Sequence, residues 1–371
     1  MNNVLFITPY FRPAQLGGGG QISIENLVDL LRNDYNVTII CFNHDFGCKR
    51  RISELFFIKE DNLCIYLFSF NDFYKIYKEI KLTKYKVVYF NSFFSPICLL
   101  FHFICFFDNK IISPKGEFYN AALRKKVIIK KAILLFFKFF KRKSTFHSTS
   151  NHEVDSIKKY FPLSKILIAR DIPSLLNQKV QRNNKICISK NTPFKIIYSS
   201  RIEPKKNLSF LPRLLIQVDG PIQFDIYGDI SDLNYFEQVL FDLKGLPTNI
   251  IWKYCGRLNF NDAKVVFSNY DLFIFPTLGE NYGYVIYESL HCGCPILLSK
   301  NTTPWDDLEA AGVGYNINLN DIKVWVDKIR YFKDMSHTNR KNISNNCLQY
   351  IQKKYDINNI INENKQIFKL Y

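Results

Sequence analysis

Two basic residues in the carboxyl-terminal half of the chain have the type and spacing needed to bind a phosphate group. Arg201 and Lys206 lie five residues apart in FKIIYSSRIEPKKNLSF, where an apolar run predicted as strand 194–199 gives way to a turn and a helix. Side chains of one loop can converge on a single dianionic group, for which arginine offers a planar fork of donors and lysine a mobile point charge. The alternative is a solvated loop with two incidental bases.

Two glutamates follow in FPTLGENYGYVIYESLHCGCPILLS, residues 275–299. The run 272–275 predicts a buried strand, Pro276 and Gly279 a turn, and residues 280–293 a helix, before another strand from Pro295. Glu280 and Glu288 differ by roughly 80° of helical phase, so we expect one acid in the loop and the other on the helix wall. A strand, a turn, a helix and a strand form one unit of a parallel α/β sheet, which binds ligands outside the carboxyl ends of its strands.

A run of four glycines, Gly17 to Gly20, separates the first predicted strand, VLFITPYF, from a helix with apolar residues at Ile22, Ile24, Leu27, Leu30 and Leu31. Without Cβ atoms such a loop lets backbone N–H groups approach an anion, and the helix start adds its dipole. The spacing is not the G-x-G-x-x-G fingerprint, so dinucleotide binding is weakly supported. A merely flexible loop is the alternative.

These motifs resemble those of the retaining glycosyltransferases of family 4 over about residues 3–330. The Glu-x(7)-Glu loop and helix after a strand ending in Pro-Thr looks like that family's donor-sugar signature, which CGCPILLSKNTTPWDDLEAAGVGYNI continues. The resemblance implies an α/β protein of the GT-B fold, with two Rossmann-like domains whose parallel sheets face across a cleft. It also implies a nucleotide diphosphate sugar as the donor substrate.

The resemblance assigns roles to single residues. Arg201 and Lys206 align with the family's diphosphate-binding pair, and Gly18 and Gly19 would lie across the cleft from the diphosphate. Glu288 would accept the ribose hydroxyls, and Glu280 would hold sugar hydroxyls or stabilise positive charge at the anomeric carbon. The nucleotide base would meet the main chain of Gly256, Arg257 and Leu258, and the helix start would offer the N–H groups of Asn281, Tyr282, Gly283 and Tyr284.

The segment ISPKGEF (112–118) looks like a motif of bacterial polysaccharide glycosyltransferases that is usually read Ser-Pro-Arg-Gly. Many relatives carry a histidine there, facing the reacting carbon. Lys115 occupies this position, so a histidine role does not carry over, and the lysine is a candidate for binding donor phosphate or acceptor. Glu117 is the nearest acid. In STFHSTSNHEVDS, Thr149 or Ser150 would cap a helix with Glu153 in a capping box, and a structural hydrogen bond is the favoured interpretation of His147.

Length and composition favour two domains. The chain has 371 residues, of which 47% are hydrophobic. We expect an amino-terminal domain over 1–180, a linker over 181–193, a nucleotide-sugar domain over 194–345, and a final helix, 346–371, that crosses back to the first domain. The start MNNVLFITPY has no basic n-region and predicts a strand rather than a signal peptide. The ten cysteines, without CxxC spacing, favour buried free thiols, and a metal site at Cys292 and Cys294 is disfavoured.

The net charge of +17 belongs almost entirely to the amino-terminal half. Residues 124–143 carry nine basic residues, no acid and four phenylalanines. Lys130, Lys131, Lys138, Lys141 and Arg142 fall within a sector of roughly 120°, with most apolar side chains opposite. This pattern is typical of a helix lying in an anionic membrane interface; a helix packed on its own domain with a solvated basic face is the alternative. No nucleic-acid motif accompanies the charge.

These observations predict a metal-independent enzyme, since no Asp-x-Asp is present to bridge a diphosphate and organic cations replace the metal. We expect sugar transfer with retention to a lipid-linked oligosaccharide, at the cytoplasmic face of the inner membrane, in the biosynthesis of O antigen, capsule or another bacterial surface polysaccharide. Trp305 and Asp306 would border the cleft or only pack. The alternatives are a nucleotide-sugar epimerase or hydrolase, a degenerate membrane scaffold, and a nucleic-acid-binding protein.

Overall fold

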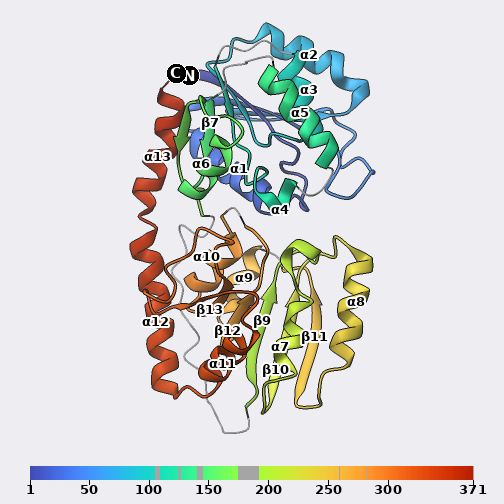
Figure 1. Ribbon diagram of the computed structural model, residues 1–371. Coiled ribbons are helices and arrows are strands. Elements are labelled where there is room, and N and C mark those ends of the chain that lie inside the picture. Colours follow the sequence, from blue (N-terminus) through green and yellow to red (C-terminus); the bar gives the residue numbers. More distant parts are fainter. Residues whose placement is uncertain are drawn as a thin grey trace. The chain divides into compact units, whose positions relative to one another are not determined.

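The computed structural model describes residues 1–104, 109–123, 127–139, 145–173, 192–258, 260–280 and 282–370. These residues form two compact units (Figure 1). Unit 1 comprises Met1–Ser174 and Ile357–Tyr371, and unit 2 comprises Leu175–Asp356. The expected boundary at residue 346 falls inside a helix of unit 2, and most of the expected linker lies outside the described residues.

Unit 1 contains an eight-stranded sheet in the order β3-β4-β2-β1-β5-β6-β7-β8. Its strands pair in parallel, except that the edge strand β3 is antiparallel to β4. The apolar runs of β1 and β5 are buried, as expected for parallel strands covered on both faces. The strands are β1 (Asn2–Ile7), β2 (Tyr35–Phe42), β3 (Phe57–Glu60), β4 (Leu63–Phe68), β5 (Val87–Phe90), β6 (Lys110–Ile112), β7 (Thr145–Ser148) and β8 (Ile166–Ile168).

The helices of unit 1 pack their apolar faces on this sheet. In α1 (Gly19–Leu31), Ile24, Leu27, Val28 and Leu31 are buried at the spacing of one helix face. The ring of Phe368, in α13 (Ile357–Lys369), lies 5.7 Å from that of Phe6, so the first strand and the last helix lie side by side (Figure 1). The other helices are α2 (Phe73–Leu82), α3 (Pro96–Ile104), α4 (Asn120–Leu123), α5 (Val127–Phe139) and α6 (Asn151–Lys158), with a 3-10 turn, η1, at Phe70–Asp72.

Unit 2 contains a six-stranded parallel sheet in the order β11-β10-β9-β12-β13-β14. Its strands are β9 (Phe194–Ser199), β10 (Ile222–Tyr227), β11 (Ile250–Gly256), β12 (Leu272–Phe275), β13 (Ile296–Ser299) and β14 (Gly314–Ile317). Its helices are α7 (Phe210–Leu215), α8 (Leu233–Lys244), α9 (Phe260–Phe267), α10 (Tyr284–His291), α11 (Ile322–Lys333) and α12 (His337–Lys354), with a 3-10 turn, η2, at Pro204–Lys206. The expected α/β architecture with two parallel-sheet domains is confirmed.

One expected element differs from the structure. The helix expected from residue 280 begins at Tyr284, because Gly283 has φ of 76° and breaks the helical path. Glu280 therefore belongs to the loop and Glu288 to the helix.

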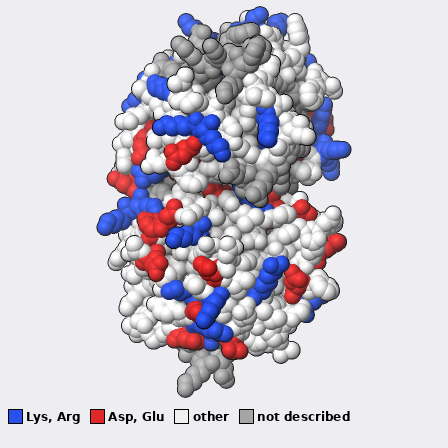
Figure 2. Space-filling view, viewed as in Figure 1, with Lys and Arg blue, Asp and Glu red and all other residues white. Residues whose placement is uncertain are grey.

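The described residues contain no helix long and apolar enough to cross a membrane. The eight cysteines within the described ranges carry free thiols. On the face shown in Figure 2, Lys and Arg side chains are interspersed with Asp and Glu rather than gathered into one continuous patch.

Candidate functional site

The parallel sheet of unit 2 brings the charged loops of the sequence to one edge. β9 and β12 are neighbouring parallel strands, so the loops that follow them, which carry Arg201–Lys206 and Glu280, emerge side by side. Main-chain and side-chain bonds join the two loops: Leu278 N donates to the Lys205 carbonyl at 2.9 Å, and Asn207 Nδ2 donates to the Pro276 carbonyl at 3.0 Å. Asn207 has φ of 57°, which turns the chain after η2.

A buried ion pair lies at the centre of this site. Lys206 Nζ donates to Glu280 Oε2, and the ammonium also lies 5.5 Å from the centre of the Phe275 ring. The side chains are only 8% and 20% exposed. Burial alone would raise the pKa of Glu280, but the charges of Lys206, Lys205 and Arg201 outweigh it and lower the pKa. Glu280 is therefore a carboxylate surrounded by three cations.

Lys205 is a cation that the sequence analysis did not single out. Its carbonyl anchors Leu278, and its side chain is partly buried. Burial lowers the pKa of its ammonium, and the neighbouring charges of Lys206 and Arg201 act in the same direction against the attraction of Glu280. The sequence signal that could have indicated it is that Lys205 lies directly beside Lys206.

The loop after β10 closes against the Arg201 loop at Gly228. A Cβ atom at Gly228 would lie 1.8 Å from the Ser200 carbonyl oxygen, so only glycine allows this approach. Gly228 N donates to the Gly256 carbonyl at 2.8 Å, which brings the turn Gly256–Leu258 to the same edge of the sheet. There Arg257 Nε lies 3.7 Å from Asp229 Oδ2. No local sequence pattern indicates the close approach at Gly228, because it depends on two strands that are far apart in the chain.

Glu288 lies on the second turn of α10. Among the described residues, no hydrogen bond or ion pair joins it to Lys206 or Glu280. Desolvation by burial raises the pKa of its carboxyl to about 7. Between the two acids, a Cβ atom at Gly283 would lie 3.2 Å from Glu280 Cγ and 2.7 Å from Ile286 Cδ1. The absence of a side chain at Gly283 therefore leaves room for the Glu280 side chain.

The aromatic residues of the same loop point into the core of unit 2. Tyr282 and Tyr284 are buried, with ring centres 4.7 Å apart, so only their main chain remains for a ligand. Trp305 is buried beside Tyr282 and does not line a surface. Asn281 lies outside the described residues.

Among the described residues, no group of three or more His, Cys, Asp or Glu is arranged to hold a metal ion.

In unit 1, the glycine run ends at the start of α1. Gly18, with φ of 67°, is the N-cap of the helix, and Gly19 is its first residue. The neighbouring Gln21 side chain fastens the loop, since Gly17 N donates to its Oε1 at 2.9 Å and its Nε2 donates to the Ala14 carbonyl. The loop is therefore an ordered turn held by its own polar contacts.

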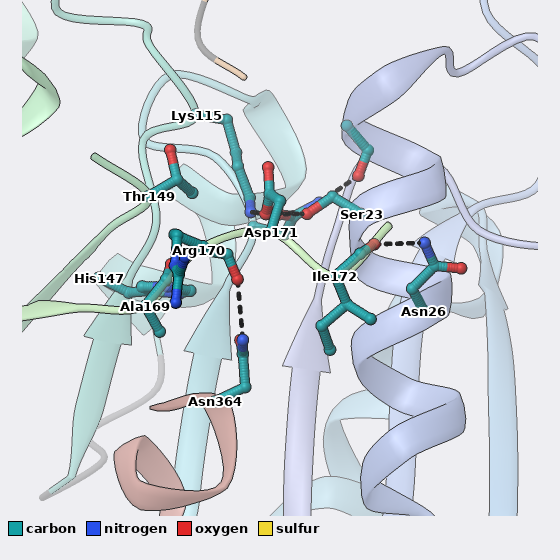
Figure 3. A network of polar contacts seen from close by, with 12 residues as sticks. Ser23, Asn26, Lys115, His147, Thr149, Ala169, Arg170, Asp171, Ile172 and Asn364 are labelled. Atoms are coloured by element: carbon teal, nitrogen blue, oxygen red, sulfur yellow. Dashed lines mark hydrogen bonds and ion pairs between the residues drawn. The ribbon is translucent and has the colours of Figure 1, made fainter. Parts of the chain in front are cut away.

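Lys115 is held in a buried polar network of unit 1 (Figure 3). Its Nζ donates to Asp171 Oδ1 at 2.6 Å and to Ser23 Oγ at 2.7 Å, and Ser23 Oγ donates to the same carboxylate at 2.5 Å. Burial alone would lower the pKa of Lys115, but Asp171 and the other groups around it raise the pKa. The ammonium thus ties the 113–118 loop to the second turn of α1 and to the segment after β8.

Two carboxylates hold the 113–118 loop from either side. Glu117 accepts from Ser92 Oγ at 2.6 Å and from the amides of Phe93 and Phe94, so it holds the segment that precedes α3. Glu153 accepts from Gly116 N at 2.5 Å and from Thr149 N at 2.9 Å. Ser150, one of the two residues expected to cap this helix, is the N-cap of α6.

His147 is buried and bonded on both ring nitrogens. Its Nδ1 lies 2.6 Å from the Tyr89 hydroxyl and its Nε2 lies 2.9 Å from the Ala169 carbonyl oxygen. Burial and the charge of Lys115 lower its pKa to about 4, so the ring is neutral near pH 7. These contacts support the structural interpretation of this histidine.

The basic helix α5 presents a mixed surface. Lys130 Nζ donates to the Ala122 carbonyl at 2.7 Å and lies 5.0 Å from the Phe94 ring, so this lysine points into its own unit. Lys131 is exposed, as are Ile128 at 85% and Leu135 at 67%. The side chain of Lys138 and residues Lys141 and Arg142 lie outside the described residues.

Comparisons with known proteins identify the fold and a family match in unit 2. Residues 180–349 match the family model of glycosyl transferases group 1, which covers most of unit 2. A curated relative, an uncharacterised glycosyltransferase of Methanocaldococcus jannaschii, is 24% identical over 182 residues. That alignment covers 47% of this chain and only 44% of the relative.

Solved glycosyltransferase structures share the fold over the whole chain. Sucrose-phosphate synthase of Thermosynechococcus elongatus gives a TM-score of 0.76 at 14% identity, covering 100% of this chain and 99% of the other. HepE of Anabaena, solved with UDP and glucose, gives 0.72 at 14% identity, with coverage of 100% and 99%. WaaG, a glycosyltransferase involved in lipopolysaccharide biosynthesis, gives 0.71 at 13% identity, with coverage of 98% and 99%. The chain therefore has the fold of the GT-B glycosyltransferases, with a group 1 sequence match in unit 2.

The burial of Glu288 gives a pH-dependent prediction. Because its folded-state pKa of about 7 lies above the ordinary 4.5, the folded protein keeps a proton that the unfolded chain loses between these pH values. The parent should therefore lose stability as the pH rises from about 5 to 7, and Glu288→Gln should not. We expect the variant to gain about 1–2 kcal/mol relative to the parent over this window, allowing for partial exposure of the carboxyl. Urea unfolding at pH 5, 6, 7 and 8 measures it, and parallel pH profiles would contradict it.

The Lys115 network predicts a loss of stability rather than of chemistry alone. Lys115→Met leaves Asp171, 5% exposed, without its cation, which typically costs about 3–5 kcal/mol. The double variant Lys115→Met/Asp171→Asn should recover most of that loss, because it leaves no buried charge unpaired. Thermal unfolding of both variants tests this expectation. A single variant as stable as the parent but inactive would instead make Lys115 a residue of the chemistry.

Proposed function

We propose that the protein is a glycosyltransferase that moves a sugar from a nucleotide diphosphate sugar to a saccharide acceptor. The observation that carries the proposal is the cluster of Arg201, Lys205 and Lys206 around Glu280 at the carboxyl ends of β9 and β12. This cluster lies within the segment that matches the group 1 family model. The UDP and glucose bound by HepE support a nucleotide sugar as the ligand class.

The chemistry that the cluster supports is departure of a nucleoside diphosphate. When the bond between the anomeric carbon and the phosphate oxygen breaks, negative charge develops on that oxygen. The three cations lie in a partly desolvated loop, where they stabilise such charge more strongly than in water. In this proposal they take the place of a bridging metal. Gly18 and Gly19, at the start of α1, are proposed to bind phosphate oxygens through their main-chain N–H groups.

The acidic residues have separate parts in the proposal. Lys206 orients Glu280, whose carboxylate binds sugar hydroxyls or stabilises positive charge at the anomeric carbon. Glu288 accepts the ribose hydroxyls, and the turn Gly256–Leu258 meets the base through its main chain. The acceptor hydroxyl forms the new bond on the face that the diphosphate leaves, so the configuration is retained, and its proton passes to the departing phosphate oxygen. Closure of the site excludes water, which would otherwise hydrolyse the donor.

The acceptor side is proposed to be unit 1, at an anionic membrane surface. α5 exposes Ile128, Ile129, Leu135 and Phe136 together with Lys131, while its other side packs in the core through Leu134 and Phe137. Exposed apolar side chains within a strongly basic segment are typical of a helix that inserts shallowly among lipid head groups. A lipid-linked oligosaccharide at the cytoplasmic leaflet, in the biosynthesis of a bacterial surface polysaccharide, is the substrate that fits this surface. The role of WaaG in lipopolysaccharide biosynthesis supports that pathway class.

Removal of Lys206 tests the proposed donor site. Lys206→Ala should lower the rate of sugar transfer by about 10²–10³-fold, because groups that stabilise charge in the transition state typically contribute ~3–4 kcal/mol. Thermal stabilisation by UDP-, GDP- and dTDP-sugars identifies the donor first, since a ligand at 100 times its Kd adds ~2.7 kcal/mol of stability. Lys244→Ala, at the exposed end of α8, is the matched control and should transfer sugar at the parent rate. Near-normal turnover of Lys206→Ala would remove the cation cluster from the site.

The exposed face of α5 predicts binding to anionic vesicles. Ile128→Asp/Leu135→Asp should release the protein from vesicles of phosphatidylglycerol and phosphatidylcholine in a flotation assay, because it places two carboxylates where apolar side chains would insert. Leu163→Asp is the control, since Leu163 is 99% exposed in the same unit but is not part of α5. Lys130→Gln should float like the parent because Lys130 points inward. Equal flotation of the double variant and the parent would end the membrane proposal.

A further inference from the structure

The loop that carries Glu280 is hydrogen-bonded to the segment that follows β13. Glu280 N donates to the Thr302 carbonyl at 2.8 Å, and the indole Nε1 of Trp305 donates to the Tyr282 carbonyl at 2.6 Å. These two bonds hold the main chain of the loop at Glu280 and at Tyr282. Because both use main-chain groups of the loop, they set the direction of its backbone and not only the place of a side chain.

The hydrogen bond from the Trp305 indole N–H to the Tyr282 carbonyl is buried. Trp305 is 1% exposed and Tyr282 is 5% exposed, so water does not compete for the bond. A buried indole N–H without an acceptor is costly, and the Tyr282 carbonyl supplies the acceptor. The bond is therefore a fixed point between two segments of unit 2 that are more than twenty residues apart in the chain.

Trp305 is also contacted by residues at the end of α12. The ring of Tyr355 lies 5.5 Å from the indole and 6.0 Å from the Tyr282 ring, and Lys354 Nζ lies 5.1 Å from the indole centre. Asp307 accepts from Lys354 Nζ at 2.5 Å and from the Tyr350 hydroxyl at 2.6 Å, which ties the helix end to the Trp305 segment. These contacts therefore restrict movement of the indole when a ligand binds at the loop.

We propose that Trp305 is a positioning residue of the donor site, which acts through the Tyr282 carbonyl. This inference rests on the proposed function. The bond to Tyr282 fixes the backbone of the loop, and the loop in turn sets the Glu280 carboxylate against Lys206 and leaves Gly283 at the start of α10 in its left-handed conformation. Without the N–H, the ring still fills the core but the loop samples other backbone directions, so the donor meets a less ordered site.

The chain contains a matched control for this bond. Trp325, in α11, is also fully buried and its indole Nε1 also donates to a main-chain carbonyl, that of Asn318, at 3.0 Å. It packs against Phe210, and within the described part of the chain it has no hydrogen bond or ring contact with residues 276–283. Trp305→Phe and Trp325→Phe thus remove the same kind of bond from the same unit, one at the donor loop and one away from it.

The test compares stability and ligand binding in the full chain. We expect both variants to lower Tm by a similar few degrees, since each loses one buried hydrogen bond. Calorimetric titration with UDP, GDP and dTDP should show that Trp305→Phe binds the parent's preferred nucleoside diphosphate about tenfold more weakly. Trp325→Phe should bind it within twofold of the parent.

Each outcome decides between the two proposals. If the parent binds a nucleoside diphosphate and both variants bind it equally well, the positioning role of Trp305 is wrong while the proposed function stands. If the parent binds none of the three nucleotides or their sugars, the proposed function fails and the inference with it. A similar loss of affinity in both variants would show a general effect of lost stability and would also overturn the inference.

A second variant keeps the proposal testable if Trp305→Phe does not fold. Tyr355→Leu leaves the indole bond in place but removes the ring that packs on both Trp305 and Tyr282. It should weaken nucleotide binding in the same direction, by about threefold. Unchanged affinity in this variant would contradict the view that the aromatic packing behind the loop orders the site.

Discussion

The candidate site depends on a buried ion pair between Lys206 and Glu280, which joins the loops after β9 and β12. A buried carboxylate needs a cation, and a buried ammonium needs an anion, so each loop is held in place by the other. Arg201 and Lys205 bring two further positive charges close to Glu280, and these charges help to lower the pKa of its carboxyl. The bare α-carbon of Gly283 leaves room for the Glu280 side chain, and glycine at position 228 allows the loop after β10 to approach Ser200.

In unit 1, too, a buried ammonium is paired with a buried carboxylate. Lys115, Asp171 and Ser23 form a buried network in which the one ammonium is used for pairing, and Glu117 and Glu153 hold the neighbouring backbone amides. The network fixes the 113–118 loop relative to the start of α1, where the glycine run lies. In unit 1 charge therefore orders the loops, whereas the cation cluster of unit 2 is the site that we propose for the donor.

Much of the fold follows from the sequence, because the signals are local. The apolar runs of β9, β12 and β13, the turn at Pro276 and Gly279, and the amphipathic α1 predicted an α/β architecture with parallel sheets. The start of the helix after Glu280 was predicted wrongly, because the left-handed backbone of Gly283 delays the start of α10 to Tyr284.

The sequence by itself determined the residue types of the site and their order along the chain: Arg201 and Lys206 in one strand-to-helix loop, Glu280 in another, and Glu288 on the helix that follows. Only the tertiary structure decided which of these groups meet and which cations are already paired. It placed Lys206 on Glu280, turned Lys115 and Lys130 into unit 1, and buried Trp305 behind the Tyr282 carbonyl. The physical reason is that pairing and desolvation depend on distances between segments far apart in sequence, which residue type and spacing do not contain.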